Sequence, residues 1–187
     1  MQTKLEKALT VLANEIERKI RKVGYLGENR GLNILHDFKL EPRSVGCSNR
    51  MVYRIKYNNR FYVVKIPYNK CEWAIEQNSS EIEVWERASE ELRNNLYRIY
   101  GYSEKRKVII GEYLPLASHH IEISKKEYRK FLSSIRKLCK PCKVYIHDVD
   151  YYSCNVRRRK NGQLTICDYG YFGIYRNKPA QIQENLR

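Results

Sequence analysis

Three polar residues in the C-terminal third of the chain have the types and spacing to hold a phosphate group. Asp150 lies five residues before Asn155, and Asp168 lies thirteen residues after Asn155, at the end of an apolar run and just before Gly170. Asn155 and Asp168 offer hard oxygen ligands of the kind that Mg²⁺ prefers. Asp150 is then left to accept or orient a substrate hydroxyl, and Gly170 permits a sharp turn after the second ligand. The spacing therefore predicts a site for metal-bound phosphate.

The same segment resembles the protein-kinase-like superfamily. That family has a D-x-x-x-x-N catalytic loop, then a hairpin, then D-[FYW]-G. This chain has D-Y-Y-S-C-N at 150–155, an Asn-Gly hairpin signal at 161–162, and D-Y-G at 168–170. Small-molecule kinases and compact phage or bacterial relatives often have D-x-H-x-G-N, where this chain has Tyr152 and Cys154 in place of the His and Gly.

The resemblance extends upstream to a lysine and a glutamate. The family places a Lys near the end of its third strand, and Val63-Val64-Lys65-Ile66 has that pattern. The resemblance implies that Lys65 contacts the α- and β-phosphates of ATP and pairs with a Glu on the following helix. Glu81 fits that position best, and Glu83 is the second choice.

A hinge that holds adenine is also expected from the resemblance. The apolar run from Val108 to Tyr113 precedes Leu114 and matches the family's strand before the hinge. Gly111 takes the gatekeeper position and is expected to leave extra room behind the base. Glu112 and Leu114 are expected to offer backbone groups to the adenine.

The glycine-rich loop departs from the family pattern. Where the family has G-x-G-x-x-G-x-V, this chain has one glycine, Gly46, and Val52 at the final position. Glycines let backbone N–H groups approach phosphate closely. Ser48 and Asn49 are expected to donate hydrogen bonds instead, with Arg50 adding positive charge, so that ATP is held loosely.

Periodicity and turn residues predict the elements around these motifs. Apolar residues at steps of three and four predict an amphipathic helix at 3–23, which packs on the domain by default or pairs with a second copy. A further helix is expected to open at Ser79, Ser80 and Glu81, with a serine as its cap. The other predicted elements are strands at 44–57 and 60–67 joined by Asn58-Asn59, strands at 96–102 and 107–113, a helix at 124–138, and strands at 143–146 and 164–167.

This element order predicts an α+β fold. With the resemblance, it implies a minimal bilobal protein-kinase-like fold with an antiparallel β-sheet N-lobe and a truncated helical C-lobe. The expected division is an N-terminal amphipathic helix at 1–32, an N-lobe at 33–113 and a C-lobe at 114–187. Seventeen residues follow Gly170, where the family continues with an activation segment and several helices. A protein substrate or partner is therefore expected to complete the short C-lobe.

The chain is strongly basic. It contains 36 Lys and Arg against 21 Asp and Glu, for a formal charge of +15. Such a surplus attracts polyanions, including nucleic acid, anionic membrane, ATP and acidic proteins. The tightest basic run, from Arg157 to Lys160, is expected to form a solvated hairpin tip.

Six cysteines and the absence of a signal sequence predict a cytoplasmic protein with reduced thiols, or host cytoplasm if it is phage-encoded. No apolar stretch is long enough to span a bilayer, so no membrane partner is expected. Cys139 and Cys142 form a C-x-x-C. It fits a redox pair or half of a zinc site with His119 and His120, although two buried thiols at a helix end is the favoured reading.

The first functional hypothesis is an ATP- and Mg²⁺-dependent phosphotransferase resembling small Ser/Thr protein kinases. Lys65 positions the phosphates, Asn155 and Asp168 hold Mg²⁺, and Asp150 orients the acceptor. The alternative is a pseudokinase, a nucleotide-binding module that acts through its basic surface. A third hypothesis is a nucleic-acid binder, which predicts steep salt dependence.

Overall fold

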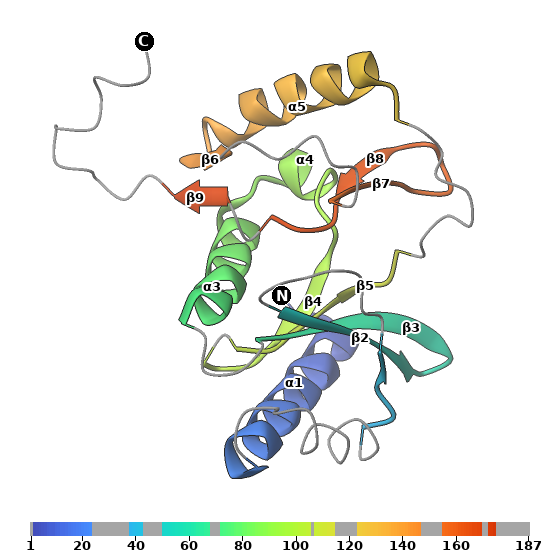
Figure 1. Ribbon diagram of the computed structural model, residues 1–187, viewed down its shortest axis with the longest axis vertical. Helices are drawn as coiled ribbons and strands as arrows, with labels where there is room; N and C mark the ends of the chain where they lie inside the picture. Colours follow the sequence, from blue (N-terminus) through green and yellow to red (C-terminus); the bar gives the residue numbers. More distant parts are fainter. Residues whose placement is uncertain are drawn as a thin grey trace, which may run out of the picture.

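The computed structural model describes residues 2–23, 38–42, 50–67, 72–105, 107–114, 123–146, 155–169 and 172–174. The described elements are mixed helix and antiparallel sheet, so the predicted α+β class is confirmed. Figure 1 shows a sheet with helix α1 on one side and helix α3 and the C-terminal elements toward the other.

A five-stranded antiparallel sheet with the order β1-β2-β3-β5-β4 forms the centre of the N-terminal part. Its strands are β1 (Glu41–Pro42), β2 (Arg50–Tyr57), β3 (Arg60–Pro67), β4 (Ile99–Tyr102) and β5 (Ile109–Glu112). Asn58 and Asn59 join β2 to β3 with φ of 46° and 60°. Positive φ at both turn residues matches the twist of a tight hairpin, so the predicted turn is confirmed.

Helix α1 (Lys4–Val23) covers one face of this sheet. Its inward residues Leu9, Ala13, Ile16 and Ile20 belong to one hydrophobic cluster with sheet residues such as Val64. A Cβ on Gly101 of β4 would lie only 2.6 Å from the backbone nitrogen of Thr10. The helix therefore packs on the domain, as expected by default.

Helix α3 (Glu72–Arg87) lies on the other side of the sheet and begins earlier than predicted. Ser79 and Ser80 lie inside the helix, so the prediction that one of them caps it is wrong. The serine cap occurs instead at the next helix, α4 (Glu90–Arg93), where the Ser89 hydroxyl accepts from the Leu92 N–H. Acidic residues follow Ser89 directly, which suits the helix dipole.

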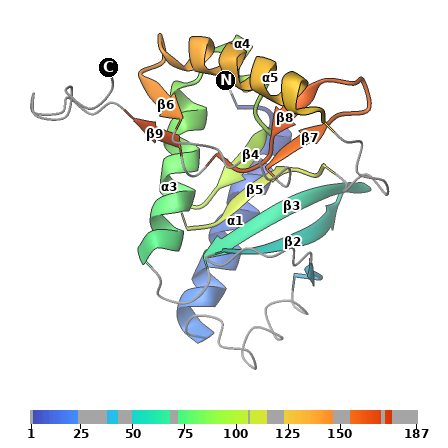
Figure 2. The same cartoon turned by 45° about the horizontal axis from the view of Figure 1, so that its top comes forward.

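The remaining elements form the C-terminal part. They are α5 (Lys125–Cys139), β6 (Val144–Ile146), β7 (Val156–Arg158), β8 (Leu164–Ile166) and β9 (Phe172–Ile174). Strand β6 pairs with β9, and β7 pairs with β8 around the Asn161-Gly162 turn, where Gly162 has φ of 85°. Ser124 caps α5 by accepting from the Glu127 N–H. Figure 2 shows α5 along the top of the molecule, above β7 and β8.

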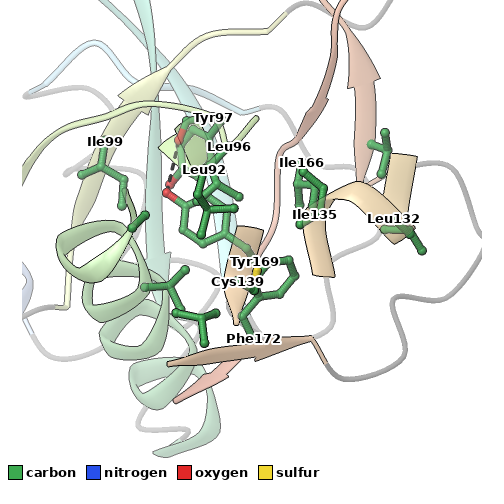
Figure 3. Packing of buried hydrophobic residues seen from close by; sticks show 14 of the residues in the cluster. Leu92, Leu96, Tyr97, Ile99, Leu132, Ile135, Cys139, Ile166, Tyr169 and Phe172 are labelled. Atoms are coloured by element: carbon green, nitrogen blue, oxygen red, sulfur yellow. Dashed lines mark hydrogen bonds between the residues drawn. The ribbon is translucent and has the colours of Figure 1, made fainter. Parts of the chain in front are cut away.

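A second hydrophobic cluster joins α3, α4 and β4 to the C-terminal elements. Figure 3 shows its tightly packed part, including Leu92, Tyr97, Ile135, Tyr169 and Phe172. The cluster contains residues from both sides of residue 113, which is the predicted boundary between the two lobes. The predicted strand at 96–102 is shorter than expected: β4 begins at Ile99, and Leu96 instead forms a lone bridge to Ile166 of β8.

Each helix that the structure describes is too short or too polar to cross a bilayer.

Candidate phosphate-binding site

Lys65 and Glu81 form a buried ion pair between strand β3 and helix α3. Lys65 Nζ lies 2.6 Å from Glu81 Oε1, and the Glu81 side chain is fully buried. Lys65 Nζ also donates to the Cys167 carbonyl at 2.8 Å and lies 4.1 Å from the centre of the Tyr97 ring. Glu83, the second-choice partner, pairs with Arg87 on its own helix. The sequence therefore identified the right glutamate as the partner of Lys65.

Arg50, the first residue of β2, enters the same cluster. Its Nη1 lies 2.5 Å from Glu81 Oε2 and 2.9 Å from Asn78 Oδ1, and its Nη2 donates to the Asp168 carboxylate. Burial disfavours a charged guanidinium, but the carboxylates of Glu81 and Asp168 outweigh it and raise the pKa of Arg50 above its usual value. Arg50 was expected to face phosphate, and here it faces two carboxylates.

Two cations and two anions thus share one buried cluster: Arg50 and Lys65 against Glu81 and Asp168. Buried charges are tolerated only when they are paired and hydrogen-bonded. Asn78, fully buried on α3, completes the pairing by donating to the carbonyls of Lys65 and Lys107. The formal charges of the two cationic and two anionic side chains balance.

The backbone of Cys167 connects Lys65 to the two predicted metal ligands. The Cys167 carbonyl accepts from Lys65 Nζ, and the Cys167 N–H donates to the Asn155 carbonyl at 2.7 Å. Asp168 follows directly in sequence, and its side chain is 19% exposed. The structure therefore brings Lys65, Asn155 and Asp168 into one neighbourhood.

Asn155 and Asp168 carry the amide and carboxylate oxygens that fit Mg²⁺. One Asp168 oxygen accepts from Arg50, so a metal at this carboxylate competes with the guanidinium. Within the described ranges no group of three or more His, Cys, Asp and Glu gathers as a metal cluster. Four predicted site residues, Asp150, Gly46, Ser48 and Asn49, lie outside the described residues.

An apolar face of the sheet lies beside Lys65. Strand register places Val52 opposite Lys65, and Val63 opposite Gly111. Because cross-strand partners share a face and side chains alternate along a strand, these residues all point to the same side of the sheet. Val52 and Val63 are partly exposed. They offer a flat apolar contact next to the lysine.

The expected room behind the adenine is absent. A Cβ on Gly111 would lie 2.2 Å from Cε2 of Tyr97 and 2.9 Å from the Arg98 carbonyl oxygen. The Tyr97 ring thus fills the space that the missing side chain leaves, and the prediction of an enlarged pocket at Gly111 is wrong. Glycine is required here because the ring approaches the strand backbone so closely.

Part of the expected hinge is already hydrogen-bonded within the protein. The Glu112 N–H donates to the Arg98 carbonyl at 2.7 Å, and the Glu112 carboxylate pairs with Arg159 at 2.7 Å. The Leu114 carbonyl accepts from Arg157 Nη1 at 2.5 Å. These two backbone groups are therefore engaged by the protein itself.

Most residues of the basic run that begins at Arg157 make contacts within the protein. Arg158 makes a two-pronged contact with Glu127 at 2.8 and 2.9 Å, and Arg159 donates to the carbonyls of Asn94 and Leu96. All three arginines are partly buried, and the exposed part begins at Lys160. The prediction of a solvated hairpin tip is wrong for the arginines, because their partners come from segments distant in sequence.

Two buried tyrosines, Tyr97 and Tyr169, pack beside the charged cluster. The Tyr169 hydroxyl donates to the Tyr97 carbonyl at 3.1 Å, drawn as a dashed line in Figure 3, and the two rings lie 5.3 Å apart. Burial raises the pKa of both hydroxyls well above the usual value. The aromatic residue of the D-Y-G motif thus anchors the segment that carries Asp168.

The described cysteines, Cys139, Cys142 and Cys167, are free of disulfide bonds. Burial raises the pKa of Cys167 to about 12 although Arg157 and Lys65 oppose the shift, and burial raises that of Cys139 to about 12. Cys142 is partly buried, and its Sγ accepts from the Ser89 N–H at 3.3 Å. Cys139 ends helix α5 in the core, in line with the favoured reading of buried thiols at a helix end.

Sequence reasoning missed Asn78 as a member of the site. Asn78 and Glu81 lie three positions apart, which places them on one helical face. That signal was hidden because the helix was expected to start at Ser79. The partners of Arg50 left no local signal, since Asp168 is 118 positions away.

No protein-family model matches this chain, and a search of the curated proteins returns no match.

Proposed function

We propose that the protein is an ATP- and Mg²⁺-dependent phosphotransferase with a compact bilobal kinase-like arrangement. One observation carries the proposal: Lys65 Nζ lies 2.6 Å from Glu81 and also contacts the carbonyl of Cys167, the residue before Asp168. A lysine held by a buried carboxylate, next to an acidic residue, is an arrangement that positions phosphate.

Each residue has a distinct role in this proposal. Lys65 donates to phosphate oxygens while Glu81 fixes the ammonium, and Val52 with Val63 contacts the base. Asn155 and Asp168 would hold Mg²⁺, which would supply positive charge to the phosphate oxygens when bound. A metal at Asp168 would compete with Arg50 for this carboxylate, and a released guanidinium would be a donor to phosphate.

Asp150 orients the hydroxyl of the acceptor, which we propose is a protein Ser or Thr. The test measures transfer from labelled ATP together with nucleotide binding by fluorescence. Asp150→Ala is expected to abolish transfer while leaving nucleotide binding within about twofold. Lys65→Met is expected to weaken both, and Lys56→Met, at an exposed lysine of β2, serves as the matched control. Full transfer by the Asp150 variant would remove that residue from the mechanism.

A second candidate is a nucleotide-binding module that does not transfer phosphate. The ion pair between Arg50 and Asp168 favours it, because the chain supplies its own cation where a kinase needs a metal. This candidate predicts that Mg-ATP raises the melting temperature of the wild-type chain without turnover. ATP stabilisation that is unchanged by EDTA would favour this module over the enzyme.

A further inference from the structure

Helix α5 exposes a continuous basic face. Its exposed cations and that of the next residue are Lys125, Lys126, Arg129, Lys130, Arg136, Lys137 and Lys140. At 3.6 residues per turn these seven positions fall within an arc of about 140° and extend about 22 Å along the axis. The single acidic residue of the helix, Glu127, lies outside this arc and is bound by Arg158. The arc is therefore of one sign from end to end.

The basic face points away from the rest of the described structure. The opposite face of α5 packs Tyr128, Leu132, Ile135 and Cys139 into the core. Both views place α5 at one end of the molecule (Figures 1 and 2). The basic face therefore lies outside the hydrophobic core.

Helix α1 provides a contrast within the same chain. It also carries six basic residues, but three glutamates are interspersed with them, and Glu17 pairs with Arg21 at 3.5 Å. Its exposed side includes the apolar Val11. Mixed charge of this kind is typical of a surface that serves solubility. The α5 face carries only positive charge, so solubility does not explain its composition.

The chemistry of the α5 face favours a phosphate backbone over a lipid surface. Helices that lie on membranes insert aromatic or aliphatic side chains beside their lysines. No exposed residue of α5 is apolar, and the exposed large apolar side chains among the described residues, Val11 and Phe61, belong to α1 and β3. Electrostatic attraction without an apolar anchor suits a polyanion in water.

The same composition favours a duplex over a single strand. Proteins that bind single strands stack bases on aromatic side chains, and both aromatic residues of α5, Tyr128 and Phe131, lie on its inward side. A 22 Å row of cations spans roughly six base pairs of duplex. Lysines contact phosphates as point charges and carry little base information.

We propose that the basic face of α5 binds the phosphate backbone of double-stranded nucleic acid, without reading its sequence. This binding is independent of the Lys65 site. The proposal assigns part of the positive charge of the chain to one surface. The arginine run after Asn155 does not form such a surface, because its side chains bond to other groups of the protein.

The experiment is a salt titration of duplex binding by the full chain. Binding of a fluorescent 20-base-pair DNA is followed by anisotropy between 50 and 200 mM KCl. The α5 variant carries Lys126→Gln, Arg129→Gln, Lys130→Gln and Lys137→Gln. The matched control carries Lys4→Gln, Lys7→Gln, Arg18→Gln and Lys22→Gln, all exposed on α1 and removing the same charge.

We expect the α5 variant to lose roughly 3 to 4 units of the slope of log K against log salt, because each lost phosphate contact removes about 0.9. Its affinity at 100 mM salt is expected to fall at least tenfold, and the control is expected to keep most of the slope. Unchanged melting temperatures verify folding, since all the replaced side chains are exposed.

Five results would overturn the proposal. Equal losses in the two variants would assign binding to net charge, and a flat salt response in the wild-type chain would dismiss binding. Tighter binding to single strands or to vesicles with anionic lipid would identify a different partner. Loss of duplex binding in Lys65→Met would place the polyanion in the nucleotide site instead.

Discussion

At the scale of single residues, Arg50 changes the chemistry of the site more than any other side chain described. It lies 2.5 Å from Glu81 and donates to Asp168, and its own side chain is 2% exposed. A buried carboxylate without a cation is strongly destabilising. Arg50 therefore couples the start of β2 to the carboxylate that is proposed to hold metal.

Replacing Arg50 tests this coupling. Arg50→Met is expected to lower the free energy of unfolding by about 3–5 kcal/mol, measured in guanidinium chloride, because Asp168 loses its cation. Millimolar Mg²⁺ is expected to raise the melting temperature of this variant more than that of wild type. Arg54→Met is the control on the same strand, where the guanidinium lies 4.4 Å from the exposed Phe61 ring and contributes about 0.5–1 kcal/mol. Equal losses in both variants would contradict the coupling.

At the scale of elements, the contact between α1 and β4 depends on a glycine. Gly101 lies where the helix backbone crosses the strand, and a Cβ there would meet Thr10 N at 2.6 Å and Leu9 C at 2.8 Å. Backbone atoms cannot move aside as a side chain can. The close approach therefore fixes how α1 covers its face of the sheet.

Gly101→Ala is expected to cost about 1–3 kcal/mol of folding free energy and to loosen α1. The specific readout is faster tryptic cleavage at Arg18 and Lys22, both exposed near the end of the helix. Gly162→Ala is the matched control, because its cost comes from a φ of 85° in the β7–β8 turn, where an added Cβ would meet no atom within 4 Å. Cleavage of α1 at the same rate in both variants would show that Gly101 has no special role.

At the scale of the whole molecule, the β7–β8 hairpin ties the C-terminal part to the sheet. The Ile166 carbonyl accepts from Tyr97 N–H, the Ile166 N–H donates to the Asn95 carbonyl, and Arg159 pairs with Glu112 at the end of β5. These contacts place Asp168 and Lys65 side by side. The position of the site is therefore set by the junction of the two parts.

Arg159→Ala is expected to lower the free energy of unfolding by about 1–3 kcal/mol, because the Leu96 carbonyl and the Glu112 carboxylate lose a partly buried charged donor. Lys160→Ala, at the exposed neighbour, is expected to stay within about 0.5 kcal/mol. A double-mutant cycle with Glu112→Gln is expected to give a coupling energy of at least about 0.5 kcal/mol. Additive effects would show that the ion pair does not hold the junction.

The α+β class, the helix at α1, the Asn58-Asn59 hairpin and the Lys65–Glu81 pair were all predictable from sequence. The first three depend on a pattern within a few residues, either an apolar period or a turn signal. The Lys65–Glu81 pair was expected from the resemblance to the protein-kinase-like superfamily. The start of α3 was not predictable in the same way. Ser79 and Ser80 have the side chains that are typical of a helix cap. In the structure they lie inside α3, which packs on the sheet and on β9.

By itself, the sequence indicated the α+β class and most of the main helices and strands, and it gave the polar residues that are proposed to bind phosphate and metal. The tertiary structure alone decided that Arg50 neutralises Asp168, that Tyr97 fills the space beside Gly111, and that the arginines of β7 turn inward while α5 keeps its cations outside. The physical reason is distance along the chain. Local patterns act between near neighbours, whereas ion pairs and ring packing between residues far apart in sequence exist only after the sheet and the C-terminal elements have packed together.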